Sequence, residues 1–321
     1  MRALRVHDYG RPPRMTYDEV PDPAPGPGQV RVRIEAAGVN PVDVYVAGGA
    51  YAIKPPLPYT PGSDAAGTIA AAGEGVERWR VGDRVFVAGT SAGRLQGAFA
   101  EQCLCDAAAE VWPLPAGVTF AQGAGLNVPY VTAFRALFDV ARAKAGERVL
   151  IHGATGGVGL AALQIAKAHR LTVIGTGGSE AGRGLLRRHG ADVVLDHAAD
   201  GYLDALRDDP PQVILEMLAN VNLPRDMEVV ADHGRIVVIG NRGEVTINPR
   251  LLMGKQATVT GLTYWSDGDR AVRRALGAIA QGLEAGDVRP VVQAEIPMAE
   301  AARAFDLVMN GPSGGKVVLI P

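Results

Sequence analysis

Cysteine is scarce in this sequence, and its scarcity limits the disulfide and metal chemistry that the chain can support. Only two of the 321 residues are cysteines, Cys103 and Cys105. Two residues apart on a strand, they share one face, but their Cα atoms lie about 6.5 Å apart, which is poor geometry for a disulfide. We therefore expect two free thiols, as in a reducing cytoplasm. A structural zinc lobe built from four cysteines is excluded.

Clustered histidines, an excess of one charge and long apolar runs are also lacking. The six histidines are scattered, and neither cysteine has one nearby, so we expect no metal site. Lysine plus arginine number 32 against 34 acidic residues, which offers no general attraction to nucleic acid. No apolar run reaches the ~18 residues of a membrane span, and the first ten residues lack the apolar centre of a signal peptide. We expect a cytoplasmic protein whose partners include neither membrane nor nucleic acid.

The pattern of predicted secondary structure changes near residue 125. The first ~120 residues hold many short strand patterns separated by turns, such as the alternating stretch 28–39, which favours a β-rich domain. After residue 125, apolar strands alternate with helices, expected over 180–189, 201–208 and 223–231. This alternation predicts an α/β fold with a doubly wound parallel sheet. The stretch 257–264 is expected to be its edge strand.

A glycine-rich turn, "HGATGGVGLAALQIAK" over 152–167, is the first motif that carries chemistry. Gly153, Gly156 and Gly159 form a GxxGxxG pattern, with Gly157 as an additional small residue. Glycines allow a tight turn, close approach of a pyrophosphate and close helix packing, while the helix N-terminus offers free N–H groups. Because the turn follows an apolar strand and opens a helix, it predicts dinucleotide binding.

The end of the next strand indicates which dinucleotide is bound. NAD-binding proteins of this kind place an acid there to hold the ribose 2′-hydroxyl. This chain instead has the stretch 176–179, "TGGS", with Arg183 close by and His197 after the third strand. A hydroxyl and a cation suit a 2′-phosphate, so the pattern favours NADPH. Glu180 does not fit this interpretation, and we expect its side chain to point to solvent.

Several segments together resemble a known family. "AAGVNPVDVY", "PPLPYTPGSDAAG", "GDRVF", "IHGATGGVGLAALQIA" and "EMLANVNL" are similar to the zinc-free quinone oxidoreductases of the medium-chain dehydrogenase/reductase superfamily, of the zeta-crystallin type. The resemblance covers essentially the whole chain. It implies a GroES-like catalytic domain over 1–125 and 264–321, and a Rossmann NADPH-binding domain over 126–263. Zinc-dependent relatives carry a cysteine and a histidine ligand in two of these segments, where this chain has Asn40 and the pair Ser63–Asp64.

The resemblance also assigns residues to sites. Thr155, Gly156, Gly157 and Val158 would hold the pyrophosphate. The remaining cofactor contacts that it implies are Tyr45, Gly178, Ser179, Arg183, His197, Asn222, Ile239, Gly240, Asn241, Arg242, Leu262, Thr263 and Tyr264. The residues expected in the catalytic pocket are Asn40, Asp43, Tyr45, Tyr51 and Asn127. Asn40 and the tyrosines would donate hydrogen bonds to the acceptor oxygen. For Tyr51 and Tyr59, packing as loop aromatics is the alternative interpretation.

The expected activity is NADPH-dependent, metal-free reduction of a quinone, in which the protein orients the reactants and excludes water. Two alternatives stay open at this point. One is an enone or alkenal double-bond reductase on the same fold, and the other is a nucleotide-binding structural or regulatory protein with little turnover. The edge strand and the resemblance imply a homodimer or a homotetramer.

Overall fold

The computed structural model describes residues 1–266 and 268–321, which form two compact units. The first unit comprises Met1–Val128 and Arg289–Pro321, and the second comprises Pro129–Val288. The chain thus returns to the first unit later than the expected residue 264. The physical reason is that helix α8 (Gly268–Ala285) is anchored in the second unit, where Arg274 pairs with Asp139.

The first unit is the β-rich half that the sequence predicted. A seven-stranded sheet has the order β14-β15-β3-β4-β5-β7, with β6 also paired to β3, and β1 and β2 form a separate antiparallel pair. Its strands are β1 (Arg2–Asp8), β2 (Arg14–Glu19), β3 (Gln29–Val39), β4 (Asp64–Ala72), β5 (Arg84–Ala88), β6 (Gln102–Asp106), β7 (Val111–Pro113), β14 (Val292–Pro297) and β15 (Lys316–Ile320). Its helices are α1 (Pro41–Ala47), α2 (Phe120–Gly123), the 3₁₀ turn Met298–Glu300 and α9 (Ala301–Asn310).

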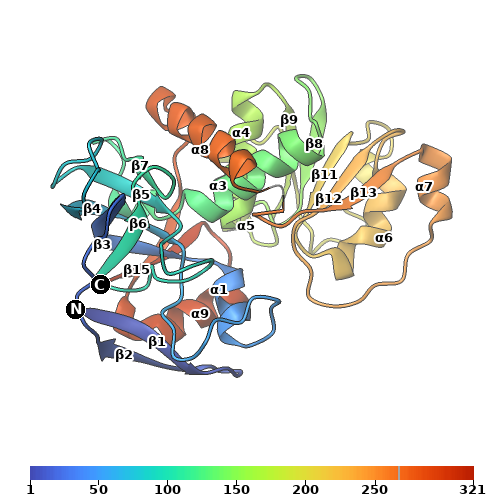
Figure 1. The fold of residues 1–321 in the computed structure, drawn as a ribbon. Coiled ribbons are helices and arrows are strands. Elements are labelled where there is room, and N and C mark those ends of the chain that lie inside the picture. Colours follow the sequence, from blue (N-terminus) through green and yellow to red (C-terminus); the bar gives the residue numbers. More distant parts are fainter. Residues whose placement is uncertain (267) are drawn as a thin grey trace. The chain divides into compact units, whose positions relative to one another are not determined.

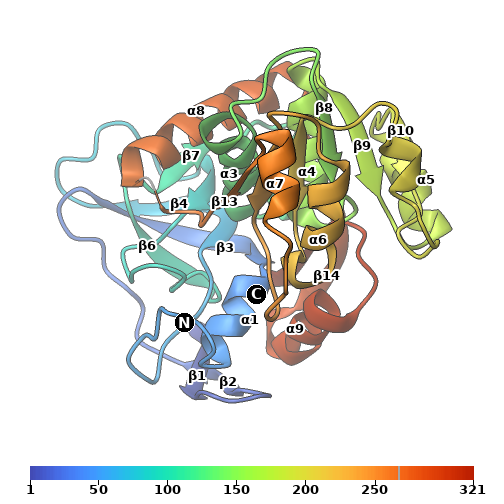
Figure 2. The same ribbon diagram turned by 90° about the vertical axis from the view of Figure 1, so that its right-hand side faces the viewer.

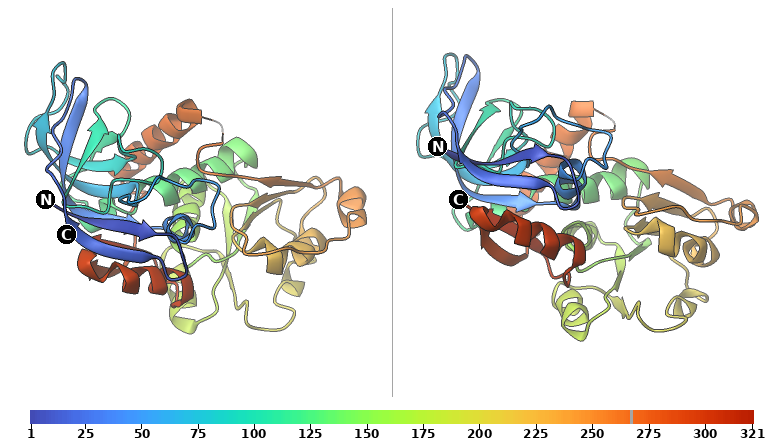
Figure 3. Two further views of the ribbon diagram at one scale, coloured as in Figure 1. Left: turned by 60° about the horizontal axis from the view of Figure 1, so that its bottom comes forward. Right: turned by 90° about the horizontal axis from the view of Figure 1, so that it is seen from below.

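Alternation of side chains along β3 explains how this sheet is built. Val30, Val32 and Ile34 are buried, whereas the arginines between them are more exposed. This is the period of two that a half-buried strand requires. Helix α9, drawn in red in Figure 3, contacts β14, β15 and α1. Cys103 and Cys105 are buried free thiols on β6, which confirms their expected state.

The second unit is a six-stranded, fully parallel sheet of order β10-β9-β8-β11-β12-β13. This confirms the expected doubly wound sheet and places the stretch 257–264 at its edge. The strands are β8 (Arg148–Ile151), β9 (Thr172–Thr176), β10 (Val193–Leu195), β11 (Val213–Glu216), β12 (Arg235–Val238) and β13 (Thr258–Gly261). Its helices are α3 (Asn127–Phe134), whose first two residues belong to the first unit, the π-helix Arg135–Val140, α4 (Gly157–Ala168), α5 (Glu180–Arg188), the 3₁₀ turn Asp204–Leu206, α6 (Ala219–Val229), α7 (Arg250–Lys255) and α8. Figure 1 shows β11, β12 and β13 side by side, and Figure 2 shows α7 beside α6.

Two helices differ from the sequence expectation. Helix α6 begins at Ala219 rather than near 223, because Ala219 N–H donates to the carbonyl of Gly240 and fixes the first turn early. Pro224 therefore lies inside the helix. The helix expected over 201–208 is only the 3₁₀ turn Asp204–Leu206. Within the described ranges of the chain, every helix is too short or too polar to cross a bilayer.

Candidate dinucleotide and acceptor sites

The glycine turn lies between β8 and α4 and leaves the start of the helix open. Gly153 has a φ of +55°, and a Cβ at Gly159 would lie 2.4 Å from the Gly153 carbonyl oxygen, so neither position suits a side chain. Gly156 caps α4 without any side-chain hydrogen bond, and the helix begins at Gly157. The first N–H groups of a helix have no partner within it. The turn therefore fits a pyrophosphate, which these amides would bind.

The turn after β9 brings together three residues predicted to surround the ribose phosphate. A Cβ at Gly178 would lie 2.5 Å from His197 Nε2, so the imidazole lies directly over this glycine. Ser179 caps α5, and its Oγ accepts from Gly182 N–H at 3.1 Å. No acid follows β9 before Glu180, as the sequence indicated.

Arg183 is held by acids in this structure. Its guanidinium pairs with Asp196 at 2.6 Å and with Glu180 at 3.0 Å, and its side chain is 17% exposed. The sequence interpretation noted Glu180 but overlooked Asp196, which directly follows β10 and precedes His197. The signal was present in "DVVLD", where an acid ends the third strand. The cation expected to attract a 2′-phosphate is thus already balanced by two carboxylates.

The turns after β11, β12 and β13 carry the other predicted cofactor residues. Asn222 donates from Nδ2 to Glu216 Oε1 at 3.2 Å. The stretch 239–242 is joined to it, because Arg242 N–H donates to Asn220 Oδ1 at 3.0 Å. Leu262 N–H donates to the Val238 carbonyl at 3.0 Å, and the fully buried Arg135 binds the carbonyls of Thr263 and Tyr264. Ligands of parallel sheets bind at these carboxyl ends of the strands.

A buried group of titratable side chains, which the sequence interpretation missed, lies at the ends of β8 and β11. His152 Nε2 is 2.8 Å from Asp226 Oδ1 and 3.6 Å from Glu216 Oε2. Burial raises the pKa of Glu216 to about 7 and that of Asp226 to about 7, and it lowers the pKa of His152. Burial also raises the pKa of Tyr202, whose ring meets His152 edge-on, to about 12.

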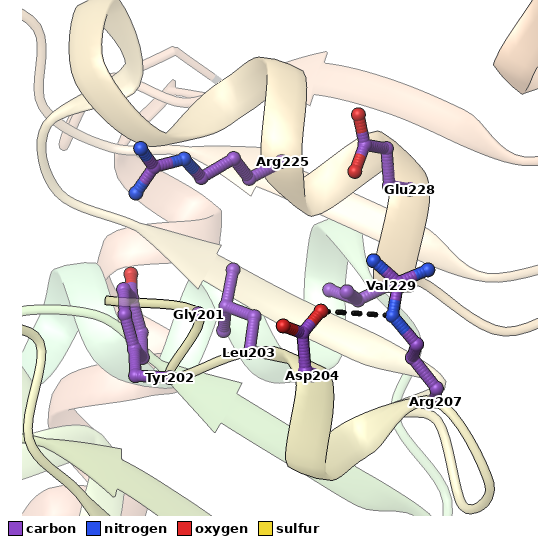
Figure 4. Close-up of a pocket in the computed structure, with 8 residues that line it drawn as sticks. All are labelled: Gly201, Tyr202, Leu203, Asp204, Arg207, Arg225, Glu228 and Val229. Atoms are coloured by element: carbon purple, nitrogen blue, oxygen red, sulfur yellow. Dashed lines mark hydrogen bonds and ion pairs between the residues drawn. The ribbon is translucent and has the colours of Figure 1, made fainter. Parts of the chain in front are cut away.

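A cavity of about 250 Å³ adjoins this group through Tyr202 (Figure 4). Its wall comes from the segment 201–207 and from the second half of α6, and it includes the ion pair of Arg207 with Asp204 at 2.8 Å. Among the described residues that line it, none was predicted as a cofactor or acceptor contact. We do not assign either ligand to this cavity.

The polar residues predicted for the acceptor pocket meet in a buried network in the first unit. Asp64 accepts from Asn40 Nδ2 at 2.9 Å and from Asn127 Nδ2 at 3.0 Å. Lys316, which the sequence interpretation missed, places its ammonium between Asn40 Oδ1 (2.5 Å) and Asp64 Oδ2 (3.1 Å). Asp43 accepts from Asn40 N–H at 2.8 Å, and burial raises its pKa to about 7. Lys316 lies on β15, nearly 280 residues from Asn40, so only the fold reveals the contact.

This network changes the interpretation of Asn40. Its amide oxygen is bonded to Lys316, and its amide nitrogen is bonded to Asp64, so the side chain serves the scaffold of the unit. Tyr45 on α1 and Tyr51 after it are both half-buried. Tyr59 is 4% exposed, and its ring packs 6.4 Å from that of Tyr9, as the alternative interpretation expected of a loop aromatic.

Comparisons with known proteins agree with the α/β fold and its GroES-like part. Residues 26–116 match the family described as alcohol dehydrogenase GroES-like domain, and residues 157–281 match the family described as zinc-binding dehydrogenase. The quinone oxidoreductase of Rattus norvegicus is 44% identical over the whole chain and 98% of its own length.

Solved structures resemble the chain over its full length as well. An NAD-dependent alcohol dehydrogenase has a TM-score of 0.91 at 28% identity and is covered completely. The Escherichia coli quinone oxidoreductase complexed with NADPH has a TM-score of 0.88 at 27% identity, also with complete coverage of both chains. The chain therefore belongs to the quinone oxidoreductase family of the medium-chain dehydrogenase/reductase superfamily.

Proposed function

We propose that this protein is an NADPH-dependent quinone oxidoreductase. The observation that carries the proposal is the open, glycine-lined N-terminus of α4 at the carboxyl end of β8, where the pyrophosphate would bind. A second support is the 44% identity to a relative named quinone oxidoreductase over the whole chain. When bound, NADPH supplies the hydride that reduces the acceptor.

NADPH rather than NADH is proposed from the end of β9. No carboxylate directly follows that strand to hold a ribose 2′-hydroxyl, and His197 lies over Gly178. Ser179 and Arg183 complete the proposed surroundings of the 2′-phosphate. The pairs of Arg183 with Glu180 and Asp196 weaken this preference, because those carboxylates repel a phosphate. The Escherichia coli relative solved with NADPH supports the same choice.

Each group of residues has a proposed task. The amides of the stretch 155–158 bind the pyrophosphate, while Asn222, Tyr45 and the stretches 239–242 and 262–264 bind the nicotinamide half. Tyr45 and Tyr51 donate hydrogen bonds to the acceptor oxygen on which negative charge develops. Asn40, Asp43 and Asn127 act more indirectly than expected, by fixing the end of β3, the start of α1 and the start of α3 around Asp64.

The residues of the first unit do not fit a catalytic zinc site. In the two segments where zinc-dependent relatives carry ligands, this chain has Asn40 and Ser63–Asp64. Asn40 and Asp64 already bind the Lys316 ammonium, which supplies a fixed positive charge at this point. An electrophilic quinone carbonyl accepts a hydride without a Lewis acid, so we derive no step through a metal. We also propose a cytoplasmic location, which the two free thiols support.

Steady-state turnover with two panels of acceptors tests the proposed function. The purified protein is given NADPH or NADH together with either quinones or α,β-unsaturated ketones and aldehydes. We expect rapid NADPH oxidation with quinones and a lower kcat/KM with both NADH and the enones. A higher kcat/KM for the enones would make the protein a double-bond reductase. Tight NADPH binding without turnover of any acceptor would favour the structural or regulatory alternative.

A further inference from the structure

The buried group of His152, Glu216 and Asp226 has no part in the mechanism above, yet His152 directly precedes the glycine turn and Glu216 binds Asn222. The three side chains are 2%, 0% and 0% exposed. Among the described residues, none lies within hydrogen-bond geometry of Glu216 Oε2 or Asp226 Oδ2. Burial of two acids is costly, and apolar replacements of such groups are often neutral or stabilising. Their presence therefore calls for a role besides stability.

A metal ion is not the role that the geometry favours. The three ligand atoms do lie within 4.8 Å of one another. However, His152 Nε2 and Asp226 Oδ1 are 2.8 Å apart, which is a hydrogen-bond distance. Two ligands of a tetrahedral zinc with bonds of about 2.0–2.1 Å would be held more than about 3 Å apart. His152 and Asp226 therefore form a hydrogen-bonded pair, and Glu216 Oε2 lies 3.6 Å from the same imidazole nitrogen.

Glu216 is the point where two of the proposed cofactor turns are joined. Its carboxylate oxygen Oε1 accepts from Leu218 N–H and from Asn222 Nδ2, the latter at 3.2 Å. These bonds fix the turn between β11 and α6. Its main-chain carbonyl accepts from Ile239 N–H at 2.8 Å and from Gly240 N–H at 3.2 Å. The turn after β12 is thus attached to the same residue.

The third turn, which carries the glycines, reaches Glu216 through His152. This histidine directly precedes Gly153, and its N–H donates to the Leu215 carbonyl at 3.0 Å. Its ring is held by Asp226, which lies on α6 one turn after Asn222. In these three neighbouring strands, the turn after β11 is therefore held by the Glu216 carboxylate, the turn after β12 by the Glu216 main-chain carbonyl, and the end of β8 by the carbonyl of the adjacent Leu215.

We infer that Glu216 is a positioning residue of the dinucleotide site. Its Oε1 holds Asn222 and the β11–α6 turn in place, while the hydrogen-bonded pair of His152 and Asp226 packs beside the carboxylate, with His152 Nε2 3.6 Å from Glu216 Oε2. The inference rests on the proposed function, because it assigns to the three turns a common task in binding NADPH. Glu216 itself touches neither the cofactor nor the acceptor in this account.

Two substitutions at position 216 separate the role of the side-chain oxygen as a hydrogen-bond acceptor from the role of its negative charge. Glu216→Ala removes the oxygen that Leu218 and Asn222 share, so we expect the Kd and KM for NADPH to rise tenfold or more, with the quinone KM within about threefold of wild type. Glu216→Gln keeps an amide oxygen at the same place, so we expect it to retain NADPH affinity within about threefold. Hydrogen exchange of the amides in 217–222 should accelerate in Glu216→Ala only.

Glu147→Ala is the matched control. Glu147 also accepts several hydrogen bonds, from Arg235 and Lys144 N–H, but it precedes β8 and lies at the opposite end of the sheet. We expect it to lower the melting temperature while leaving the NADPH Kd unchanged. If Glu216→Ala does not fold, Glu216→Asp, which withdraws the carboxylate by one methylene, should show the same rise in Kd.

The outcomes distinguish this inference from the proposed function. If wild type binds no NADPH, the proposed function itself is wrong. If wild type binds NADPH and Glu216→Ala binds it within twofold as tightly, only the positioning role is overturned. An equal loss of NADPH affinity in Glu216→Gln and Glu216→Ala also overturns the positioning role, because the side-chain oxygen that accepts from Leu218 and Asn222 would then not be the decisive feature.

Discussion

At the scale of single residues, the structure shows how differently two predicted site residues are surrounded. Asp43 is completely buried on α1, where its carboxylate accepts from Asn40 N–H. Arg183 is partly exposed and holds two acids. Sequence alone identified both residues but not the carboxylates that act on them from other segments, Asp64 near Asp43 and Asp196 beside Arg183.

Asp43→Asn should change how stability depends on pH. Burial, and secondarily the charge of Asp64, raise the pKa of Asp43 in the folded protein to about 7, above its ordinary value of 3.8. The folded state therefore binds more protons than the unfolded state between about pH 4 and pH 7. The contribution of Asp43 to the free energy of unfolding is fully present below about pH 4 and is lost as the pH rises through 7. The loss amounts to at most about 4 kcal/mol. An asparagine at position 43 keeps a side-chain oxygen that can accept the hydrogen bond from Asn40 N–H, but it does not titrate.

Urea unfolding at a series of pH values measures this effect. We expect Asp43→Asn to gain stability relative to wild type steadily between pH 4.5 and pH 8. Glu216 and Asp226 titrate in the same direction in both proteins, so the difference between the two curves isolates Asp43. A difference that stays constant with pH would show that Asp43 is ionised throughout.

Asp196→Asn should shift the choice of cofactor further toward NADPH. The substitution removes the carboxylate that pairs with Arg183 at 2.6 Å and releases the guanidinium for a phosphate. Asparagine retains the oxygen that accepts from Ala198 N–H. We expect the KM for NADPH to fall about threefold to tenfold and that for NADH to change less. The exposed acid Asp208 provides the control variant Asp208→Asn, and an unchanged KM ratio in Asp196→Asn would argue against a 2′-phosphate at Arg183.

At the scale of elements, the sequence predicted the parallel sheet and its helices well, because apolar strands and amphipathic helices are local patterns. The predicted start of α6 near residue 223 was wrong, because a tertiary hydrogen bond from Ala219 N–H to the Gly240 carbonyl determines where the helix begins. The glycine turn was recognisable because its residues are contiguous. Lys316 and the group of His152, Glu216 and Asp226 were not, because each assembles from segments far apart in the chain.

Gly159→Ala should disrupt the start of α4. A methyl group there would lie 2.4 Å from the Gly153 carbonyl and 2.5 Å from Ala154 Cα, so the turn and the helix must move apart. We expect the Kd for NADPH, measured by fluorescence titration, to rise at least tenfold. Gly254→Ala, in helix α7 with no atom within 4 Å of the added methyl, is the control and should leave binding unchanged. Equal effects of the two substitutions would contradict the role of the turn.

At the scale of the whole molecule, the exposed edge of the parallel sheet supports a homodimer. Strand β13 is an edge strand, and most of its residues are exposed. Thr258 and Leu262 direct their N–H groups to Gly234 and Val238, so by alternation the N–H of Gly261 points away from β12. We propose that a second copy pairs with this edge, which would hide it from solvent.

Gly261→Pro tests this assembly, because proline removes the outward N–H group. We expect sedimentation analysis to give a dimer for wild type and for the control Gly261→Ala, and a smaller species for Gly261→Pro. If the wild-type protein forms a tetramer, the proline variant should fall to a dimer or a monomer. An unchanged assembly in Gly261→Pro would place the subunit interface elsewhere.

We propose above that NADPH bound at the glycine turn delivers its hydride to a quinone. The most direct measurement is the rate of NADPH oxidation by the purified protein with a simple benzoquinone or naphthoquinone, in parallel with Gly159→Ala. We expect rapid, quinone-dependent loss of NADPH absorbance in wild type and a KM for NADPH raised at least tenfold in the variant. No quinone-dependent oxidation by wild-type protein that binds NADPH would contradict it.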